Sequence, residues 1–392
     1  MTRAEVTTML GGVASFGLPG SPAVAPRQPL DHDDWHLLLA HVRRQRITGL
    51  LAEAISTEFF PATDAQAAEA FDLSTEVLAT ELTLEATLLR VAETFEHEVI
   101  PFRVLKGPAV AHLDYPDPAL RDFGDIDLLI QPDDLDRTVA VLTEQGFARR
   151  FPEPRAGFDR RFTKSVSVVN PDGTELDLHR TLAPGVFGLR VRVETLWDAI
   201  PVQFVLGNRT LFALGSAERF IHACYHAVLG NAPPRLVPLR DIAQMLLCGS
   251  VAPDQVRTVA AAWRGEVVVK HAIMTACATM RLTDVVALSS WAAEDSAGSQ
   301  QRELARALSL NYSYTAQALD SVRAIPTMRD RLRYVSALAF PRRSYLNGRY
   351  SGHASRFGHA VTELLTAHTS SQPVEPATAG ASAHLEVRET SD

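Results

Sequence analysis

The apolar positions between Asp31 and Glu98 recur at the spacing of α-helices. Leu38 and Val42 lie on one helical face, and Leu84 and Leu88 continue such a face after Pro61. We therefore predict that residues 31–98 are helical. Residues 1–30 contain several glycines and prolines, which favour turns over helices, so we expect a flexible leader with order beginning near Asp31.

From residue 99 onward, short apolar runs alternate with helical patterns. Asn170-Pro171-Asp172-Gly173 is typical of a tight turn between the strands of a hairpin, and Pro132 and Gly146 can begin and end a helix. The elements predicted in this region are strands at 102–106, 126–130, 158–169, 174–179, 202–207 and 210–214 and helices at 108–114 and 132–145.

Helical patterns return at Ser216 and continue through 252–281 and 301–339. Residues 366–392 are rich in Ala, Ser, Thr and Pro, which predicts a disordered tail. The predicted fold class is α+β, with a mixed β-sheet flanked by helical regions. The predicted parts are a leader (1–30), an N-terminal helical region (31–98), a domain with the sheet (99–215), a C-terminal helical domain (216–365) and the tail (366–392).

Two aspartates stand at the beginning of the second predicted strand. Side chains alternate along a strand, so Asp125 and Asp127 leave the same face, whereas Ile126 and Leu128 leave the other. Two carboxylates this close favour a divalent cation with oxygen ligands, and magnesium is such a cation. A solvated pair at a strand start is the alternative interpretation.

A later strand supplies a further carboxylate. In 174–179, Glu175, Asp177 and His179 share one face. Asp177 lies in the middle of the strand between two leucines, which favours it over Glu175 as a third metal ligand. Glu175 remains a possible substitute.

Composition agrees with an enzyme but does not select one. The 392 residues carry a net charge of −8, which argues against a general affinity for nucleic acid. A local excess of basic residues, either a solvated hairpin edge or a surface for phosphates, comprises Arg149, Arg150, Arg155, Arg160, Arg161 and Lys164.

The cysteines and the hydropathy suggest a location. Cys224, Cys248 and Cys277 are far apart in the sequence, as expected of reduced thiols in a cytoplasmic protein. A secretory signal is not expected, because glycines and Pro19 interrupt the N-terminal apolar stretch. No apolar run is long enough to predict a membrane span.

Two histidines and one aspartate in the C-terminal helices leave several interpretations open. His222 and His226 share a helical face and could pack together, bind a metal, or contact a substrate. The sequence HACYH lacks the glutamate of zinc proteases, so zinc hydrolysis is disfavoured. Asp241 is interpreted first as a helix cap or an ion-pair partner of Arg240, and second as part of an acceptor pocket.

These motifs together resemble the nucleotidyltransferase fold of the DNA-polymerase-beta superfamily. The closest resemblance is to a bacterial family of uncharacterised nucleotidyltransferases, and it covers about residues 100–247. The motifs that carry it are Leu105-Lys106-Gly107, Tyr115, Arg121 ahead of GDIDLLI at 124–130, Gln145-Gly146-Phe147 and LDLH at 176–179.

The resemblance implies a site and a reaction. Asp125, Asp127 and Asp177 would bind two Mg²⁺ ions, with Asp177 also able to take a proton from the acceptor. Lys106 and Gly107 would contact the triphosphate of a nucleotide, with ATP the expected one. Arg121 would grip a phosphate or hold the aspartates, and His179 would orient Asp177, contact a phosphate or make a structural hydrogen bond.

The turn after the first strand departs from the superfamily pattern. Many members have Gly-Ser there, whereas this chain has Lys106-Gly107 followed by Pro108, which leaves fewer backbone donors for phosphates. An exposed strand-end lysine is the alternative role for Lys106. The missing serine leaves open an altered site that binds nucleotide without turnover.

The resemblance therefore implies transfer of a nucleoside monophosphate from a nucleoside triphosphate to a hydroxyl, with release of pyrophosphate. A small molecule or a peptide is the first hypothesis for the acceptor. Transfer to tRNA or protein and a non-catalytic nucleotide-binding role are the alternatives. The sequence does not identify the acceptor, the base of the nucleotide or the oligomeric state.

Overall fold

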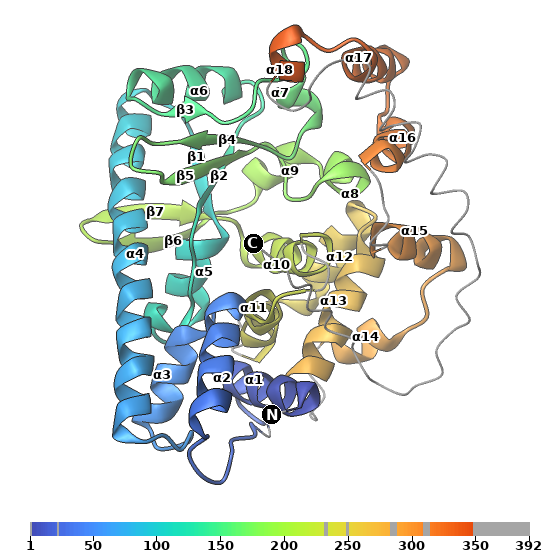
Figure 1. Ribbon diagram of the computed structural model, residues 1–392. Helices are drawn as coiled ribbons and strands as arrows, with labels where there is room; N and C mark the ends of the chain where they lie inside the picture. The colour runs from blue at the N-terminus through green and yellow to red at the C-terminus, as the bar shows by residue number, and fades with distance from the viewer. Residues whose placement is uncertain are drawn as a thin grey trace.

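A computed structural model describes residues 2–21, 23–230, 234–247, 251–282, 288–308 and 314–347 (Figure 1). Cys248 and the segment 366–392 lie outside these residues, so the predictions for them are not tested. Within the described ranges, a mixed sheet of seven strands lies between a long N-terminal helix and a group of C-terminal helices. The predicted α+β class is confirmed.

Four helices precede the sheet: α1 (Arg3–Ser15), α2 (His32–Gln45), α3 (Thr48–Ser56) and α4 (Asp64–His97). Helix α4 carries its apolar stripe against the sheet, where Leu84, Leu88 and Phe95 are buried. In Figure 1, α4 runs along one whole side of the molecule.

The prediction of a flexible leader is wrong for residues 3–15. Helix α1 begins at a capping box between Thr2 and Glu5, and it packs against α11 through a buried apolar face. A Cβ added to Gly12 would lie 1.9 Å from the carbonyl oxygen of Val24. Gly12, one of the glycines on which the prediction of a flexible leader was based, therefore permits close contact between α1 and the chain at Val24.

The sheet has the strand order β3-β4-β5-β2-β1-β7-β6. Its strands are β1 (Phe102–Leu105), β2 (Ile126–Ile130), β3 (Ala148–Arg149), β4 (Ser165–Val169), β5 (Glu175–His179), β6 (Val202–Leu206) and β7 (Arg209–Ala213). The central strand β2 is antiparallel to β1 and parallel to β5. Both predicted hairpins, β4–β5 and β6–β7, are present.

The two faces of β2 join different cores. Ile126 and Leu128 pack in the cluster that contains the α4 side chains, whereas Leu129 packs with side chains of the C-terminal helices. Because the strand alternates, Asp127 lies on the same face as Leu129 and is turned toward those helices.

Two predicted boundaries differ from the structure. Residues 159–162 form a short helix, α7 (Asp159–Phe162), ahead of β4, where a continuous strand was predicted. The Glu153 carboxylate accepts hydrogen bonds from the backbone of Gly157 and Phe158, which turns the chain there. Helix α6 (Leu135–Glu144) begins three residues after Pro132, the residue at which the helix was predicted to begin.

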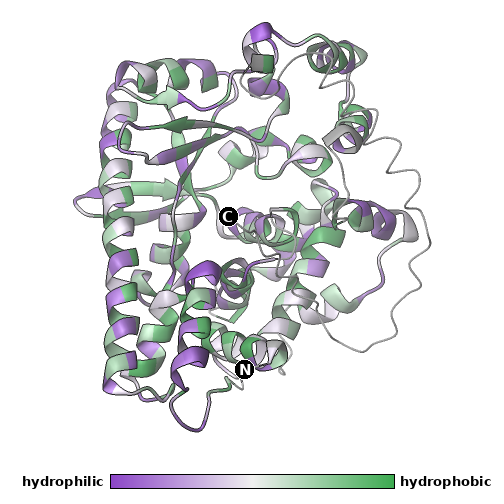
Figure 2. Cartoon of the chain, in the orientation of Figure 1, coloured by the Kyte–Doolittle hydropathy of each residue, from purple (hydrophilic) through white to green (hydrophobic). Residues whose placement is uncertain are grey.

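The remaining helices are α5 (Lys106–Asp114), the 3₁₀ turn η1 (Pro118–Leu120), α8 (Gly185–Arg190), α9 (Val193–Asp198), α10 (Ser216–Leu229), α11 (Leu236–Leu247), α12 (Pro253–Ala262), α13 (Glu266–Thr279), α14 (Ser289–Ala293), α15 (Gly298–Leu308), α16 (Tyr314–Ala324), α17 (Met328–Ala339) and α18 (Arg343–Asn347). Apolar residues of α1–α3 and α10–α13 form one core, in which Cys224 is a buried free thiol. Figure 2 shows the apolar positions gathered where these helices meet. Among the described residues, no helix combines the length and the apolar character that a membrane span requires.

Candidate active site

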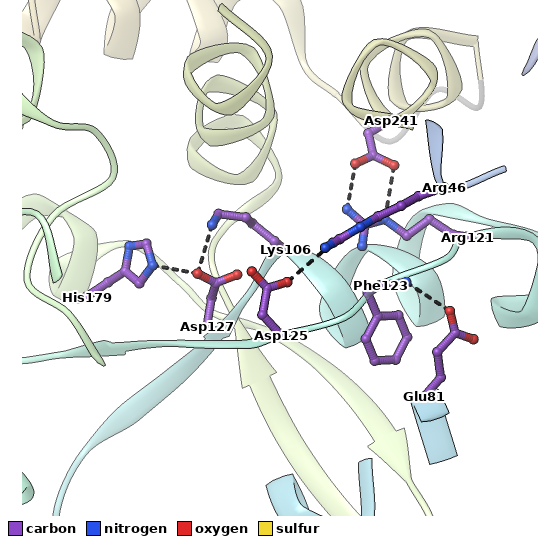
Figure 3. Close-up of polar contacts among 9 residues, drawn as sticks. All are labelled: Arg46, Glu81, Lys106, Arg121, Phe123, Asp125, Asp127, His179 and Asp241. Carbon is purple, nitrogen blue, oxygen red and sulfur yellow. Dashed lines mark hydrogen bonds and ion pairs between the residues drawn. The ribbon is translucent and has the colours of Figure 1, made fainter. Parts of the chain in front are cut away.

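The predicted carboxylates meet where β2 and β5 run side by side. The parallel register places Asp127 directly beside Asp177. Asp125 precedes β2 by one residue and points to the same side as Asp127 (Figure 3). Asp127 is only 1% exposed, whereas the side chain of Asp125 is 44% exposed.

Asp127 has two basic neighbours on one oxygen. Lys106 Nζ lies 2.8 Å and His179 Nε2 lies 2.6 Å from Asp127 Oδ1 (Figure 3). Burial alone would raise the pKa of Asp127, but the charge of Lys106 and the hydrogen bond from His179 hold it well below its usual value. Asp127 is therefore ionised at neutral pH.

His179 keeps its imidazole buried beneath Asp127. Burial and the charge of Lys164 lower the pKa of His179, against the opposing charge of Asp127. The other ring nitrogen, Nδ1, lies 3.2 Å from the Thr181 carbonyl oxygen, so both ring nitrogens face acceptors. A neutral ring can donate to only one of them, and we assign the proton to Nε2, where the contact with Asp127 is shorter. His179 thus orients Asp127, rather than Asp177 as one sequence-based alternative proposed.

Asp177 and Asp125 have different surroundings. The Ser167 hydroxyl on β4 donates a hydrogen bond to Asp177 Oδ1. Asp125 forms an ion pair with Arg46, whose Nη1 lies 3.6 Å from Oδ1. Arg46 follows α2, 79 positions before Asp125, so its place in the site could not be read from the sequence pattern.

The Lys-Gly turn that opens α5 has an unusual backbone. Lys106 has a φ of +41°, a conformation that costs free energy for a residue with a side chain. Gly107 is buried and departs from helical angles at φ 6° and ψ −106°. The backbone thus holds the Lys106 ammonium over the carboxylates. This position does not agree with the alternative interpretation of Lys106 as an exposed lysine at the end of a strand.

Arg121 does not hold the aspartates of the site. Its guanidinium binds Asp241 on α11 with two nitrogens, Nε at 3.2 Å and Nη2 at 2.8 Å, and both side chains are buried (Figure 3). Tyr115 donates a third hydrogen bond to Asp241 at 2.9 Å. Arg240, which the sequence analysis considered as a partner of Asp241, binds the carbonyl oxygens of Ala14 and Phe16.

Lys164 is a site residue that the sequence analysis placed elsewhere. It precedes β4, opposite the end of β5 where His179 lies. Burial and the nearby charge of Lys106 lower the pKa of Lys164, while Asp127, Asp177 and Asp125 oppose that shift. Only the strand register could have shown that this lysine belongs to the site and not to the basic hairpin.

The other basic residues of that segment are engaged in contacts. Arg149 pairs with Asp159, Arg150 pairs with Glu175, and Arg155 donates to the Phe340 carbonyl oxygen. These contacts agree with the interpretation of a solvated hairpin edge.

His222 and His226 on α10 lie over the acidic face. The rings of His222 and His179 meet edge to face, with centroids 6.1 Å apart. Burial and the charge of Lys106 hold the pKa of both α10 histidines well below the usual value, so both are neutral. His222 is 2% exposed, and its Nε2 has no hydrogen-bond partner among the described residues. A buried polar atom without a partner is costly, which makes His222 Nε2 a candidate contact for a substrate.

The residues present fit a divalent cation. Asp127 and Asp177 form a cluster with His179 in which the potential ligand atoms lie within 4.8 Å of one another, and Asp125 adds a carboxylate at the same strand end. With its proton on Nε2, His179 supports Asp127 and leaves the carboxylates as the ligands. Carboxylate oxygens are the ligands that Mg²⁺ prefers. The Lys106 ammonium, 2.8 Å from Asp127, supplies a positive charge to the same oxygen.

Comparison with known proteins identifies one family. The profile of the family described as "Uncharacterised nucleotidyltransferase" matches residues 31–281. No curated protein matches the chain. A crystal structure of an antigenic nucleotidyltransferase-like protein from Paracoccidioides brasiliensis is similar at 14% identity and a TM-score of 0.32, over 51% of this chain and 92% of that one.

Proposed function

Since the chain belongs to the family of uncharacterised nucleotidyltransferases, we propose that it transfers a nucleoside monophosphate from a nucleoside triphosphate to a hydroxyl group. The acceptor oxygen forms a bond to the α-phosphorus, the bond from that phosphorus to the bridging oxygen breaks, and pyrophosphate leaves. ATP is the expected donor. The observation that carries the proposal is the register that sets Asp127 beside Asp177.

The carboxylates Asp125, Asp127 and Asp177 would hold Mg²⁺. The bound cations would neutralise the triphosphate and lower the pKa of the attacking hydroxyl. Asp177 is less buried than Asp127 and accepts a hydrogen bond from Ser167. We propose that Asp177 takes the proton from the acceptor hydroxyl. His179 keeps Asp127 in place.

The basic residues would bind the phosphates. Lys106 and Lys164 bring two positive charges to the acidic face, and Arg46 brings a third beside Asp125. In the structure, Lys106 neutralises Asp127. When a cation takes over that role, the ammonium becomes available for an anionic phosphate oxygen. Gly107 lets the backbone of the turn come close to the same group.

The acceptor is a hydroxyl of a small molecule or a peptide, or of an RNA or a protein. The site residues do not separate these classes, because in this proposal they would contact only the nucleotide and the attacking oxygen. A nucleotide-binding protein without turnover is the non-catalytic alternative.

The test is transfer of label from α-³²P-labelled ATP in the presence of Mg²⁺. Pools of sugars, hydroxyl-bearing peptides and total RNA serve as acceptors, and pyrophosphate release is measured in parallel. Asp125→Asn, Asp127→Asn and Asp177→Asn should each reduce turnover by roughly 10²-fold or more, because each removes charge that stabilises the transition state. Mn²⁺ binding followed by paramagnetic resonance should weaken in the same variants.

Glu175→Gln is the matched control. Glu175 lies on the same strand and face as Asp177 but pairs with Arg150, so its loss should leave turnover within about twofold. Turnover that survives in Asp125→Asn/Asp127→Asn would reject the site. Nucleotide binding without pyrophosphate release from any pool would favour the non-catalytic alternative.

A further inference from the structure

The C-terminal helices enclose a groove that is distinct from the acidic site. It has a volume of about 760 Å³ and lies between α8, α12, α15, α16 and the start of α17. Its lining contains seven arginines and two carboxylates: Arg190, Arg192, Arg264, Arg302, Arg306, Arg323 and Arg331, with Glu303 and Asp320. The formal charge of the lining is therefore +5, in a chain whose total is −8.

Several of these arginines are not neutralised. Arg190 binds Glu303 with two nitrogens at 2.9 Å, and Asp320 is shared between two further arginines at 3.4 and 3.8 Å. Arg192, Arg264 and Arg302 are exposed and have no ion-pair partner within the described ranges. Three positive charges without a protein counter-ion thus lie at one hollow, which attracts anions to it.

A second, smaller hollow also has arginines in its lining. It has a volume of about 300 Å³ and is lined by Arg155, Arg160, Arg161 and Arg333, of which Arg160 pairs with Asp136 and Arg333 pairs with Asp330. Helix α17 contributes Arg331 to the larger groove and Arg333 to this hollow, and residues two positions apart leave a helix in nearly opposite directions, so the hollow does not continue the groove. Figure 1 shows α15, α16 and α17 following one another along the side of the molecule opposite α4. The seven arginines of the larger groove, spread over about 760 Å³, suit a chain of phosphates better than a single small anion.

We propose that this arginine groove binds the sugar-phosphate backbone of single-stranded RNA. The guanidinium group matches phosphate oxygens with two parallel hydrogen bonds. The lining of the larger groove contains no aromatic side chain, so it offers charge for the backbone and no surface for stacking bases. Binding at this surface is therefore largely independent of base sequence.

We choose RNA over an acidic peptide as the occupant because one strand can serve both the groove and the proposed reaction, and this step rests on the proposed function. An RNA strand carries both the phosphates for the groove and a terminal hydroxyl for nucleotidyl transfer. Helix α8, which lines the groove, begins at Gly185, shortly after β5 ends at His179. The strand that carries Asp177 thus leads directly into the wall of the groove.

The test uses the full chain with EDTA and without nucleotide, so that it is independent of catalysis. Fluorescence anisotropy of a labelled single-stranded RNA of about 12 nucleotides is measured across a salt series. Arg192→Gln/Arg264→Gln/Arg302→Gln should weaken binding at least tenfold at low salt. The slope of log affinity against log salt should fall by about 2, because each phosphate contact with a single strand contributes about 0.7.

The control variant Arg27→Gln/Arg137→Gln/Arg281→Gln removes the same charge at exposed positions that do not line the groove. It should bind RNA like the unmodified chain, and unfolding curves should show that both triple variants are folded. Equal binding by both triple variants, no binding by the unmodified chain, or preference for a polyglutamate peptide of the same charge would overturn the proposal. RNA binding through the groove, together with no pyrophosphate release from any acceptor pool, would uphold this inference and reject the proposed function instead.

Discussion

Replacement of Arg121 by methionine should destabilise the fold rather than weaken nucleotide binding. In the structure, Arg121 and Asp241 are almost fully enclosed, with side-chain exposures of 5% and 3%. The methionine would remove both guanidinium hydrogen bonds and leave the Asp241 carboxylate buried with only Tyr115 as a donor among the contacts described here.

The expected loss follows from the unpaired charge. Breaking a buried ion pair by removing one partner typically costs about 3–5 kcal/mol, a large part of the roughly 5–15 kcal/mol that stabilises a typical domain. The double variant Arg121→Met/Asp241→Asn should regain most of this stability, because the amide is neutral and its oxygen still accepts from Tyr115. The coupling between the two positions should be favourable by at least 2 kcal/mol.

Urea unfolding followed by circular dichroism measures these differences, and ATP titration calorimetry on the folded variants measures binding. The structural role of Arg121 would be refuted if Arg121→Met unfolded like the unmodified chain while its affinity for ATP fell tenfold or more. That outcome would restore the sequence-based hypothesis that Arg121 grips a phosphate.

Three further changes test other parts of the structure. Glu81 is buried, and burial raises its pKa to about 8, above its ordinary value of 4.5. The stability linked to its proton is fully present below pH 4.5 and is lost as the pH rises through about 8. Glu81→Gln should therefore flatten the pH dependence of the free energy of unfolding between these values, and above them it should be more stable than the unmodified chain by up to about 5 kcal/mol. Parallel stability curves for the two proteins would contradict this. His222→Phe removes the unpartnered Nε2 and should preserve or raise thermal stability while reducing turnover, and unchanged kinetic constants would assign His222 to packing alone. Gly12→Ala should lower the melting temperature, because its Cβ would meet the Val24 carbonyl oxygen. Gly11→Ala is the control, since its nearest contact lies at 3.6 Å, and it should be neutral or stabilising. Equal effects of the two substitutions would mean that α1 does not pack as described.

The carboxylates of the site could be predicted because local rules govern them. Strand alternation places Asp125 with Asp127 on one face and selects the face of Asp177. The resemblance of the motifs supplied the remaining step, that the two strands are neighbours, and the register of β2 and β5 agrees with it.

The contacts missed by the sequence analysis are those made between distant segments. Arg46 reaches Asp125 from the end of α2, and Arg121 pairs with Asp241, which is 120 positions away. Lys164 was grouped with basic neighbours because a charge at the start of a strand is usually solvated. Such pairs depend on how elements pack, which composition and periodicity do not encode.

Helix α1 was missed for a different reason. Glycine lowers helix propensity, so Gly11-Gly12 argued against a helix there. Tertiary contacts outweigh this weak preference, since Leu10, Val13 and Ala14 are buried in the core shared with the C-terminal helices.

That shared core has a consequence for how the chain folds during synthesis. Apolar residues of α1–α3 become buried only when α10–α13, which follow roughly 200 residues later, have been synthesised and pack against them. Contacts so distant in sequence close late and slow folding, and they leave the emerging N-terminal segment exposed to aggregation in the meantime. A fragment of residues 99–215 would therefore expose the face of the sheet that carries Asp127, so the protein is best produced and studied with both ends of this core intact.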